Sequence, residues 1–163
     1  MRSREGFLVL LQELDGDVAE LAKVADRNRR AWDRICSGAI DPIDWGALGF
    51  TIHTAYGVIE NYFVRISKFF ENGLPSSAWH KALVDKMSLD IPGLRPAPLT
   101  SASDKEAVLE VLKFRHRIRN LYGEDLDPAK TEAVQGVAMG LFGRFPAIHA
   151  AYRRKLADIA ESL

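Results

Sequence analysis

Between Glu110 and Glu124 the chain carries positive side chains and no acidic one. The cationic residues in this run are Lys113, Arg115, Arg117 and Arg119. Such a run repels itself and favours an anionic partner. Guanidinium groups bind phosphate through paired hydrogen bonds, and the imidazole of His116 is of the type that transfers protons near neutral pH. This combination of groups would suit acid–base chemistry on a phosphodiester.

Helical geometry would sort these side chains into two stripes. Arg115, Arg119 and Tyr122 are spaced as i, i+4 and i+7, whereas His116 and Asn120 are spaced as i and i+4. Guanidinium, imidazole and phenol groups would then share one patch. A second interpretation is also open, because positive side chains near the C-terminal end of any helix are stabilised by its macrodipole and can simply be solvated.

Apolar residues at alternating spacings of four and three predict the helices that would hold this patch. The first helix is capped by Ser3 and stopped by Gly38, and Asn28 is the single polar residue in its apolar seam. The second helix opens at residues 41–42, an aspartate followed by a first-turn proline, and closes at residues 72–73.

The connection to the third long helix contains a short helix and a proline-rich loop. The short helix is predicted over residues 77–89, and the segment 91–98 that follows cannot be helical. A capping-box pattern, Ser103 followed by Glu106, predicts the start of the third long helix, which ends near residues 122–123.

The fourth long helix starts at residues 127–128, again an aspartate followed by a proline, and Pro146 should kink it. No segment alternates with period two over the length of a strand. The sequence therefore predicts an all-α fold, an antiparallel up-down four-helix bundle with a short extra helix between helices 2 and 3. We expect residues 1–163 to form a single domain.

Composition excludes several classes of protein. The chain has 163 residues, and its 22 Lys and Arg balance its 22 Asp and Glu, so a polycationic tail is not its means of binding. Cys36 is the only cysteine, which rules out an intramolecular disulfide and a cysteine-rich zinc site. We expect a cytoplasmic protein with no membrane partner, because no apolar run approaches the length of a membrane span.

The architecture and the motif resemble the HEPN superfamily, and in particular the HepT-like ribonuclease toxins. Those proteins carry the motif Arg-x4-His-x-Tyr at the end of the penultimate bundle helix. In this chain the motif arginine is Arg115, the polar residue after it is His116 and the motif tyrosine is Tyr122. The motif histidine falls on Asn120, which departs from the family's pattern.

The resemblance implies a homodimeric ribonuclease that needs neither metal nor cofactor and activates the ribose 2′-hydroxyl for attack on the adjacent phosphate. It assigns the catalytic site to Arg115, His116, Asn120 and Tyr122. The neighbouring cations Lys113, Arg117 and Arg119 would bind the RNA backbone. In HepT-like systems a nucleotidyltransferase antitoxin adds nucleotides to the motif tyrosine, so the resemblance also makes Tyr122 the predicted modification site.

Two functions stay open at this point. Asn120 cannot accept and return a proton at neutral pH, and His116 is the only residue of the motif that could replace it. The chain is therefore either a ribonuclease with a degenerate motif, or an inactive HEPN helical module that binds a partner protein such as a nucleotidyltransferase antitoxin.

Other polar residues are interpreted as structural. Glu60, Asn61 and Tyr62 on the second helix are expected to be surface residues, and His53 is expected to be partly buried and hydrogen-bonded. His80 has no acidic or histidine partner at metal-ligand spacing. No metal site is expected from these residues.

Overall fold

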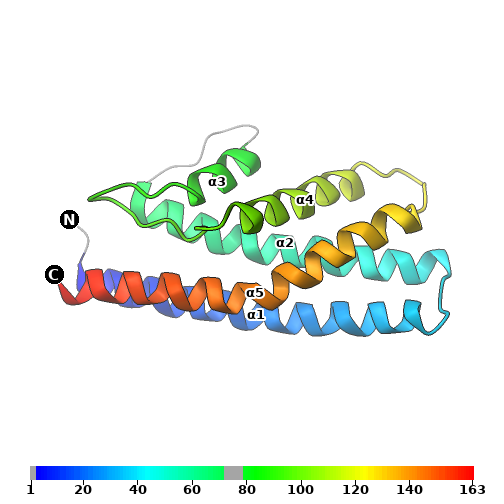
Figure 1. The fold of residues 1–163 in the computed structure, drawn as a ribbon, viewed down its shortest axis with the longest axis horizontal. Coiled ribbons are helices and arrows are strands. Elements are labelled where there is room, and N and C mark those ends of the chain that lie inside the picture. The colour runs from blue at the N-terminus through cyan, green and yellow to red at the C-terminus, as the bar shows by residue number, and fades with distance from the viewer. Residues whose placement is uncertain (1–2, 72–78) are drawn as a thin grey trace.

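The computed structural model describes residues 3–71 and 79–163, and every regular element in these ranges is a helix (Figure 1). The helices are α1 (Arg4–Cys36), α2 (Pro42–Glu71), α3 (Trp79–Met87), α4 (Ala102–Arg119) and α5 (Pro128–Glu161). Figure 1 shows α1, α2, α4 and α5 lying along the long axis of the molecule in alternating direction, with the short α3 beside α4. The predicted all-α bundle with an extra helix is confirmed. The predicted boundaries at residues 72–73 and 77 lie outside the described residues.

Most of the long helices start at the capping residue that the sequence predicts. Ser3 accepts a hydrogen bond from the Gly6 amide at 3.1 Å, and Asp127 accepts one from the Lys130 amide at 3.0 Å. The predicted start of the third long helix at Ser103 is wrong by two residues. Ser101 is the cap, because its extended backbone lets its hydroxyl accept from the amide of Asp104.

The core lies along the seam between the four long helices. Asn28 sits in this seam with only 1% of its surface exposed, and it exchanges two hydrogen bonds of 2.8 Å with the amide of Gln135 on α5. A buried amide is tolerated there because its partner satisfies it. The axis of α5 bends near its middle in Figure 1, and Pro146 falls in the middle of that helix, as the sequence predicts.

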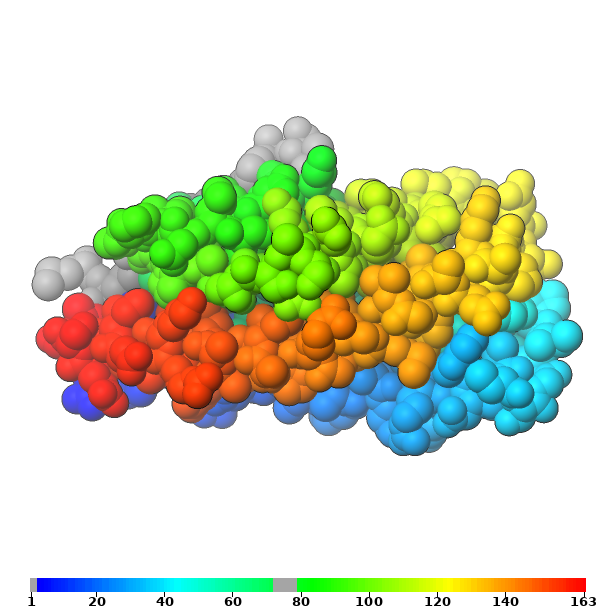
Figure 2. Space-filling view, viewed as in Figure 1, coloured from blue at the N-terminus to red at the C-terminus, as the bar shows by residue number. Residues whose placement is uncertain are grey.

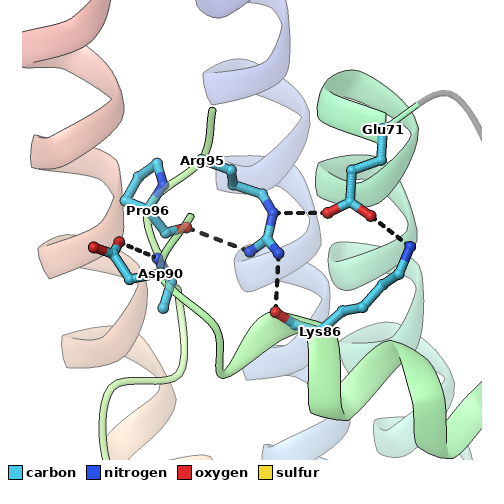
Figure 3. Close-up of polar contacts among 6 residues, drawn as sticks. Glu71, Lys86, Asp90, Arg95 and Pro96 are labelled. Atoms are coloured by element: carbon cyan, nitrogen blue, oxygen red, sulfur yellow. Dashed lines mark hydrogen bonds and ion pairs between the residues drawn. The ribbon is translucent and has the colours of Figure 1, made fainter. Parts of the chain in front are cut away.

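A buried arginine fixes the loop that follows α3 (Figure 3). The Arg95 side chain is fully buried, and it donates to the Glu71 carboxylate at 3.1 Å and to the carbonyl of Lys86 at 2.9 Å. Lys86 holds the other oxygen of Glu71 at 2.5 Å. This network ties the end of α2 to α3 and so fixes the position of α3 against the bundle.

The Glu71 network predicts an acid-dependent loss of stability. Burial acts to raise the pKa of the Glu71 carboxyl, but Lys86 and Arg95 outweigh it and hold this pKa below the ordinary value of 4.5. A lowered pKa in the folded state stabilises the protein above the unfolded value, and this contribution is lost as the pH falls through the folded value. Glu71→Gln should therefore destabilise the protein at pH 7 and by much less at pH 3.

Urea unfolding of the wild type and Glu71→Gln at both pH values measures this difference. Glu132→Gln, an exposed change on α5, is the control and should shift the free energy of unfolding little at either pH. A Glu71→Gln deficit of the same size at pH 3 and pH 7 would contradict the assignment.

No helix in the described part of the chain has an apolar stretch long enough to cross a membrane.

Candidate functional site

Asn120 ends α4, three residues earlier than the sequence predicts. Arg119 is the last helical residue, and the side-chain amide of Asn120 donates to the carbonyl of His116 at 2.9 Å. This hydrogen bond satisfies one of the carbonyls that a helix end leaves without a partner. Tyr122 therefore lies beyond the helix, 87% exposed, and does not continue the stripe of Arg115 and Arg119.

Arg115 points toward α2 rather than into solvent. Its Nη1 donates to Oε1 of Glu60 at 2.8 Å, and its guanidinium lies over the ring of Tyr56 at 5.2 Å. The side chains of Arg115 and Glu60 are 16% and 10% exposed, so this ion pair is partly desolvated. The expectation that Glu60 lies on the surface is wrong. The Nε of Arg115 is buried and has no hydrogen-bond partner among the described residues.

Glu60 also binds a histidine from α3. Nδ1 of His80 lies 2.5 Å from Oε2 of Glu60, so a single carboxylate joins His80 and Arg115. The ring of His80 stacks on Trp79 at a centroid distance of 4.1 Å. Its other contact is edge to face with His116 on α4, at 5.6 Å. We call Glu60, His80, Arg115 and His116 the α4-end cluster.

The cluster lies where α3 packs against α4. Figure 2 shows α3 and α4 side by side on one face of the molecule, above α5. The α4–α5 connection packs closely on α2 at Gly49, where a Cβ would lie 2.4 Å from a methyl group of Leu126 and would require that side chain to move.

Two other residues of α2 near Arg115, Tyr56 and His53, have pKa values shifted toward their neutral forms. Burial, with the charge of Glu60 as a smaller cause, raises the pKa of the Tyr56 phenol well above its usual range. Burial, together with the positive charges of Arg115 and Arg119, lowers the pKa of His53. The sequence predicts a partly buried, hydrogen-bonded His53. The residue is partly buried, but its Nδ1 has no hydrogen-bond partner among the described residues.

The motif side chains border two different hollows of the same protomer. His116, Arg117 and Asn120 help to line one of about 470 Å³ at the end of α4. Arg115 lines another, of about 460 Å³, together with His53. His116 and Asn120 therefore line the same pocket, whereas Arg115, although it belongs to the α4-end cluster, lines a second pocket on the α2 side.

The remaining positively charged residues near the end of α4 differ in whether they form ion pairs. Lys113 pairs with Glu110 at 2.7 Å, both being exposed, and Arg117 lies over the ring of Phe114 at 5.8 Å. Arg117 and Arg119 are exposed and have no ion-pair partner among the described residues. These two guanidinium groups are the ones most available to an external anion.

Sequence reasoning missed the roles of Glu60 and His80. A sequence pattern does not reveal an ion pair between residues 20 positions apart, because it depends on where α3 packs. Tyr62 also continues the apolar spacing of α2, and in agreement with that spacing, and not with a surface position, it is buried and contacts His149 at 3.1 Å, whereas Asn61 is exposed as expected. Among the described residues, no three His, Cys, Asp or Glu side chains are close enough to hold a metal ion.

The comparisons with known proteins agree with this architecture. The model of a family described as HepT-like protein matches residues 47–156, which run from near the start of α2 into the last turns of α5. No curated protein and no solved structure gives a match. The matched region contains the whole α4-end cluster and more than half of the chain, and the chain therefore belongs to the HepT-like family.

Proposed function

We propose that this HepT-like protein is the toxin of a toxin–antitoxin system, a homodimeric endoribonuclease that uses no metal. The observation that carries the proposal is the α4-end cluster, in which a guanidinium shares one carboxylate with an imidazole that contacts a second imidazole. Arginine can stabilise the charge that develops on a phosphate in the transition state, and imidazole can move protons. These are the groups that cleavage of RNA by its own 2′-hydroxyl requires.

Each motif residue then has a distinct role. Arg115 stabilises the phosphate and His116 is a proton-transfer group. Asn120 has a second hydrogen on its amide besides the one that caps α4, and this hydrogen orients a phosphate oxygen. Arg117, Arg119 and Lys113 hold the flanking backbone.

A homodimer explains why the motif borders two hollows. Two α4 ends that face each other would join the pocket beside Arg115 of one copy to the pocket beside His116 and Asn120 of the other, which gives one continuous site for RNA. Sedimentation equilibrium should therefore give twice the mass of the 163-residue chain. A strict monomer at micromolar concentration would contradict the two-copy site.

The exposed phenol of Tyr122 suits modification by a partner enzyme. A nucleotidyltransferase antitoxin would join the phenol oxygen to the α-phosphorus of a nucleoside triphosphate, releasing pyrophosphate and the phenol proton. The added phosphate brings negative charge to the segment that follows the last turn of α4, where Arg117 and Arg119 lie, and so weakens the attraction of this region for RNA. The proposed partners are therefore RNA, a second copy of the chain and such an antitoxin.

Salt dependence of RNA binding tests the role of the two free arginines. Each phosphate contact to single-stranded RNA adds about 0.7 to the slope of log affinity against log salt. Arg117→Gln and Arg119→Gln should each reduce that slope by roughly this amount, measured by fluorescence anisotropy with a non-cleavable 2′-O-methyl RNA.

Arg30→Gln is the matched control, since Arg30 is an exposed arginine on α1, which packs on α2 and α5. It should leave the slope unchanged. If Arg30→Gln changed the salt dependence and Arg117→Gln and Arg119→Gln did not, the RNA would bind away from the end of α4.

The direct test of the function is incubation of purified protein with total cellular RNA in the presence of EDTA. We expect fragments to accumulate with time, since the proposed chemistry needs no metal. Intact RNA at micromolar protein would exclude the ribonuclease and favour the second candidate, the inactive module that binds a partner. One observation favours that module, namely that Asn120 serves as a helix cap and cannot transfer a proton.

A further inference from the structure

We infer that His80 is the catalytic residue that accepts the proton of the ribose 2′-hydroxyl, with Glu60 as its positioning residue. The inference rests on the proposed ribonuclease function and assigns the step for which the motif lacks a histidine at position 120. It concerns a residue of α3, outside the motif and 36 positions before His116 in the sequence.

The hydrogen bonding of His80 is that of an oriented general base. Nδ1 contacts Oε2 of Glu60 at 2.5 Å, which leaves Nε2 as the ring nitrogen without a hydrogen-bond partner among the described residues. A carboxylate at Nδ1 favours the tautomer whose Nε2 is unprotonated and stabilises the imidazolium that forms when Nε2 takes a proton. Stacking on Trp79 fixes the plane of the ring.

Glu60 connects the base to the group that binds the phosphate. Its second oxygen holds Nη1 of Arg115, so the same carboxylate sets the positions of the imidazole and the guanidinium relative to each other. The His80 side chain is 21% exposed and so is partly accessible from outside, whereas Glu60 is only 10% exposed. Because the imidazole and the guanidinium are both held by Glu60, neither side chain has to be ordered when the substrate binds.

The chain has four histidines, and the other three suit this step less well. His53 lies at the hollow on the Arg115 side, and burial lowers its pKa. His149 is buried between Tyr62 and Asp15, with both ring nitrogens engaged. His116 has no carboxylate partner among the described residues, and its exposed ring faces His80.

The reaction then uses both imidazoles. The 2′-oxygen attacks phosphorus while its proton passes to Nε2 of His80, and the bond between phosphorus and the 5′-oxygen breaks. His116 donates a proton to the departing 5′-oxygen. The products are a 2′,3′-cyclic phosphate and a 5′-hydroxyl, and proton exchange with solvent resets the two rings. No other reactant is needed.

A substrate with sulfur at the 5′-bridging position separates the two roles, because a thiolate leaves without receiving a proton. His80→Gln and His80→Phe should slow cleavage of a short RNA on the order of 10²-fold, on the ordinary and on the sulfur substrate alike. His116→Gln should slow cleavage of the ordinary substrate only. His80→Phe keeps an aromatic ring against Trp79, so it separates the loss of the base from the loss of stacking.

Controls separate catalysis from folding. His149→Gln also replaces a histidine that contacts a carboxylate, but away from the cluster, and it should stay within twofold of wild type. The His80 variants should bind 2′-O-methyl RNA with unchanged affinity, so that the loss lies in kcat. Glu60→Gln should lower kcat in the same way, and the His80→Gln change should then add little to it.

The outcomes distinguish this inference from the function on which it rests. Cleavage that is lost in Arg115→Ala but unchanged in both His80 variants would overturn the role of His80 and leave the ribonuclease standing. Rescue of the His80 variants by the sulfur substrate would make His80 the acid and overturn its assignment as base. No cleavage by the wild type would remove the proposed function itself.

Discussion

Arg115→Ala should lower the rate of RNA cleavage on the order of 10³-fold, because a guanidinium aimed at the developing phosphate charge acts mainly in the transition state. The partly buried position strengthens this effect, since water screens the charge less there than at the surface. Arg115→Lys should recover only part of the rate. A guanidinium can donate to Glu60 and to the phosphate from different nitrogens at the same time, whereas an ammonium group has a single nitrogen and cannot span both.

Initial rates on a fluorescent RNA in EDTA measure this effect, and Arg30→Ala on α1 controls for the loss of a surface arginine. Thermal unfolding of each variant shows whether the bundle is intact, since Glu60 keeps His80 as a partner when Arg115 is removed. An Arg115→Ala enzyme that is well folded and cleaves RNA like the wild type would mean that the motif is not the nuclease.

Asn120→His should restore activity where His80 has been removed. If His80 replaces the histidine that the motif lacks, adding one at position 120 should raise the rate of His80→Gln on the order of 10²-fold. The same change in the wild type should have a much smaller effect, because a base is already present. This non-additivity is the expected signature of two groups that perform one step.

A double-mutant cycle of the four proteins, with rates measured on one RNA, gives the coupling directly. Asn120→Gln in the His80→Gln background controls for a longer side chain at the end of α4, and it should restore nothing. Equal gains from Asn120→His in the presence and absence of His80 would show that the two positions act independently. No gain in either background would count against Asn120 as the position of the motif histidine.

The helices were predictable because each has a local signal. Apolar residues every three or four positions define α1 and α2, and the caps at Ser3 and Asp127 act within three residues of sequence. The sequence predicts the start of α4 two residues late, because Ser101 and Ser103 both carry a hydroxyl at a suitable spacing and only the extended backbone at Ser101 decides between them.

The candidate site was predictable only in part, because its most informative contacts are not local. The motif pointed to Arg115 and His116, but nothing in the sequence pairs Glu60 with either Arg115 or His80. The contact between Glu60 and His80 depends on how α3 packs against the bundle. The position of α3 is set by the buried Arg95, which donates hydrogen bonds to the Glu71 carboxylate and to the Lys86 carbonyl. A glutamate next to an apolar position of a helix, such as Glu60, is weak evidence for a buried ion pair, because most glutamates in such positions are exposed to solvent.

The most direct measurement uses a DNA oligonucleotide that contains a single ribonucleotide, incubated with the wild-type protein in EDTA. The 2′-hydroxyl is the proposed nucleophile, so cutting should occur only at that linkage and leave a 2′,3′-cyclic phosphate and a 5′-hydroxyl, which mass spectrometry identifies. Uncut oligonucleotide, cutting at deoxyribose linkages, or ends that carry a free 3′-hydroxyl would contradict the account of the α4-end cluster.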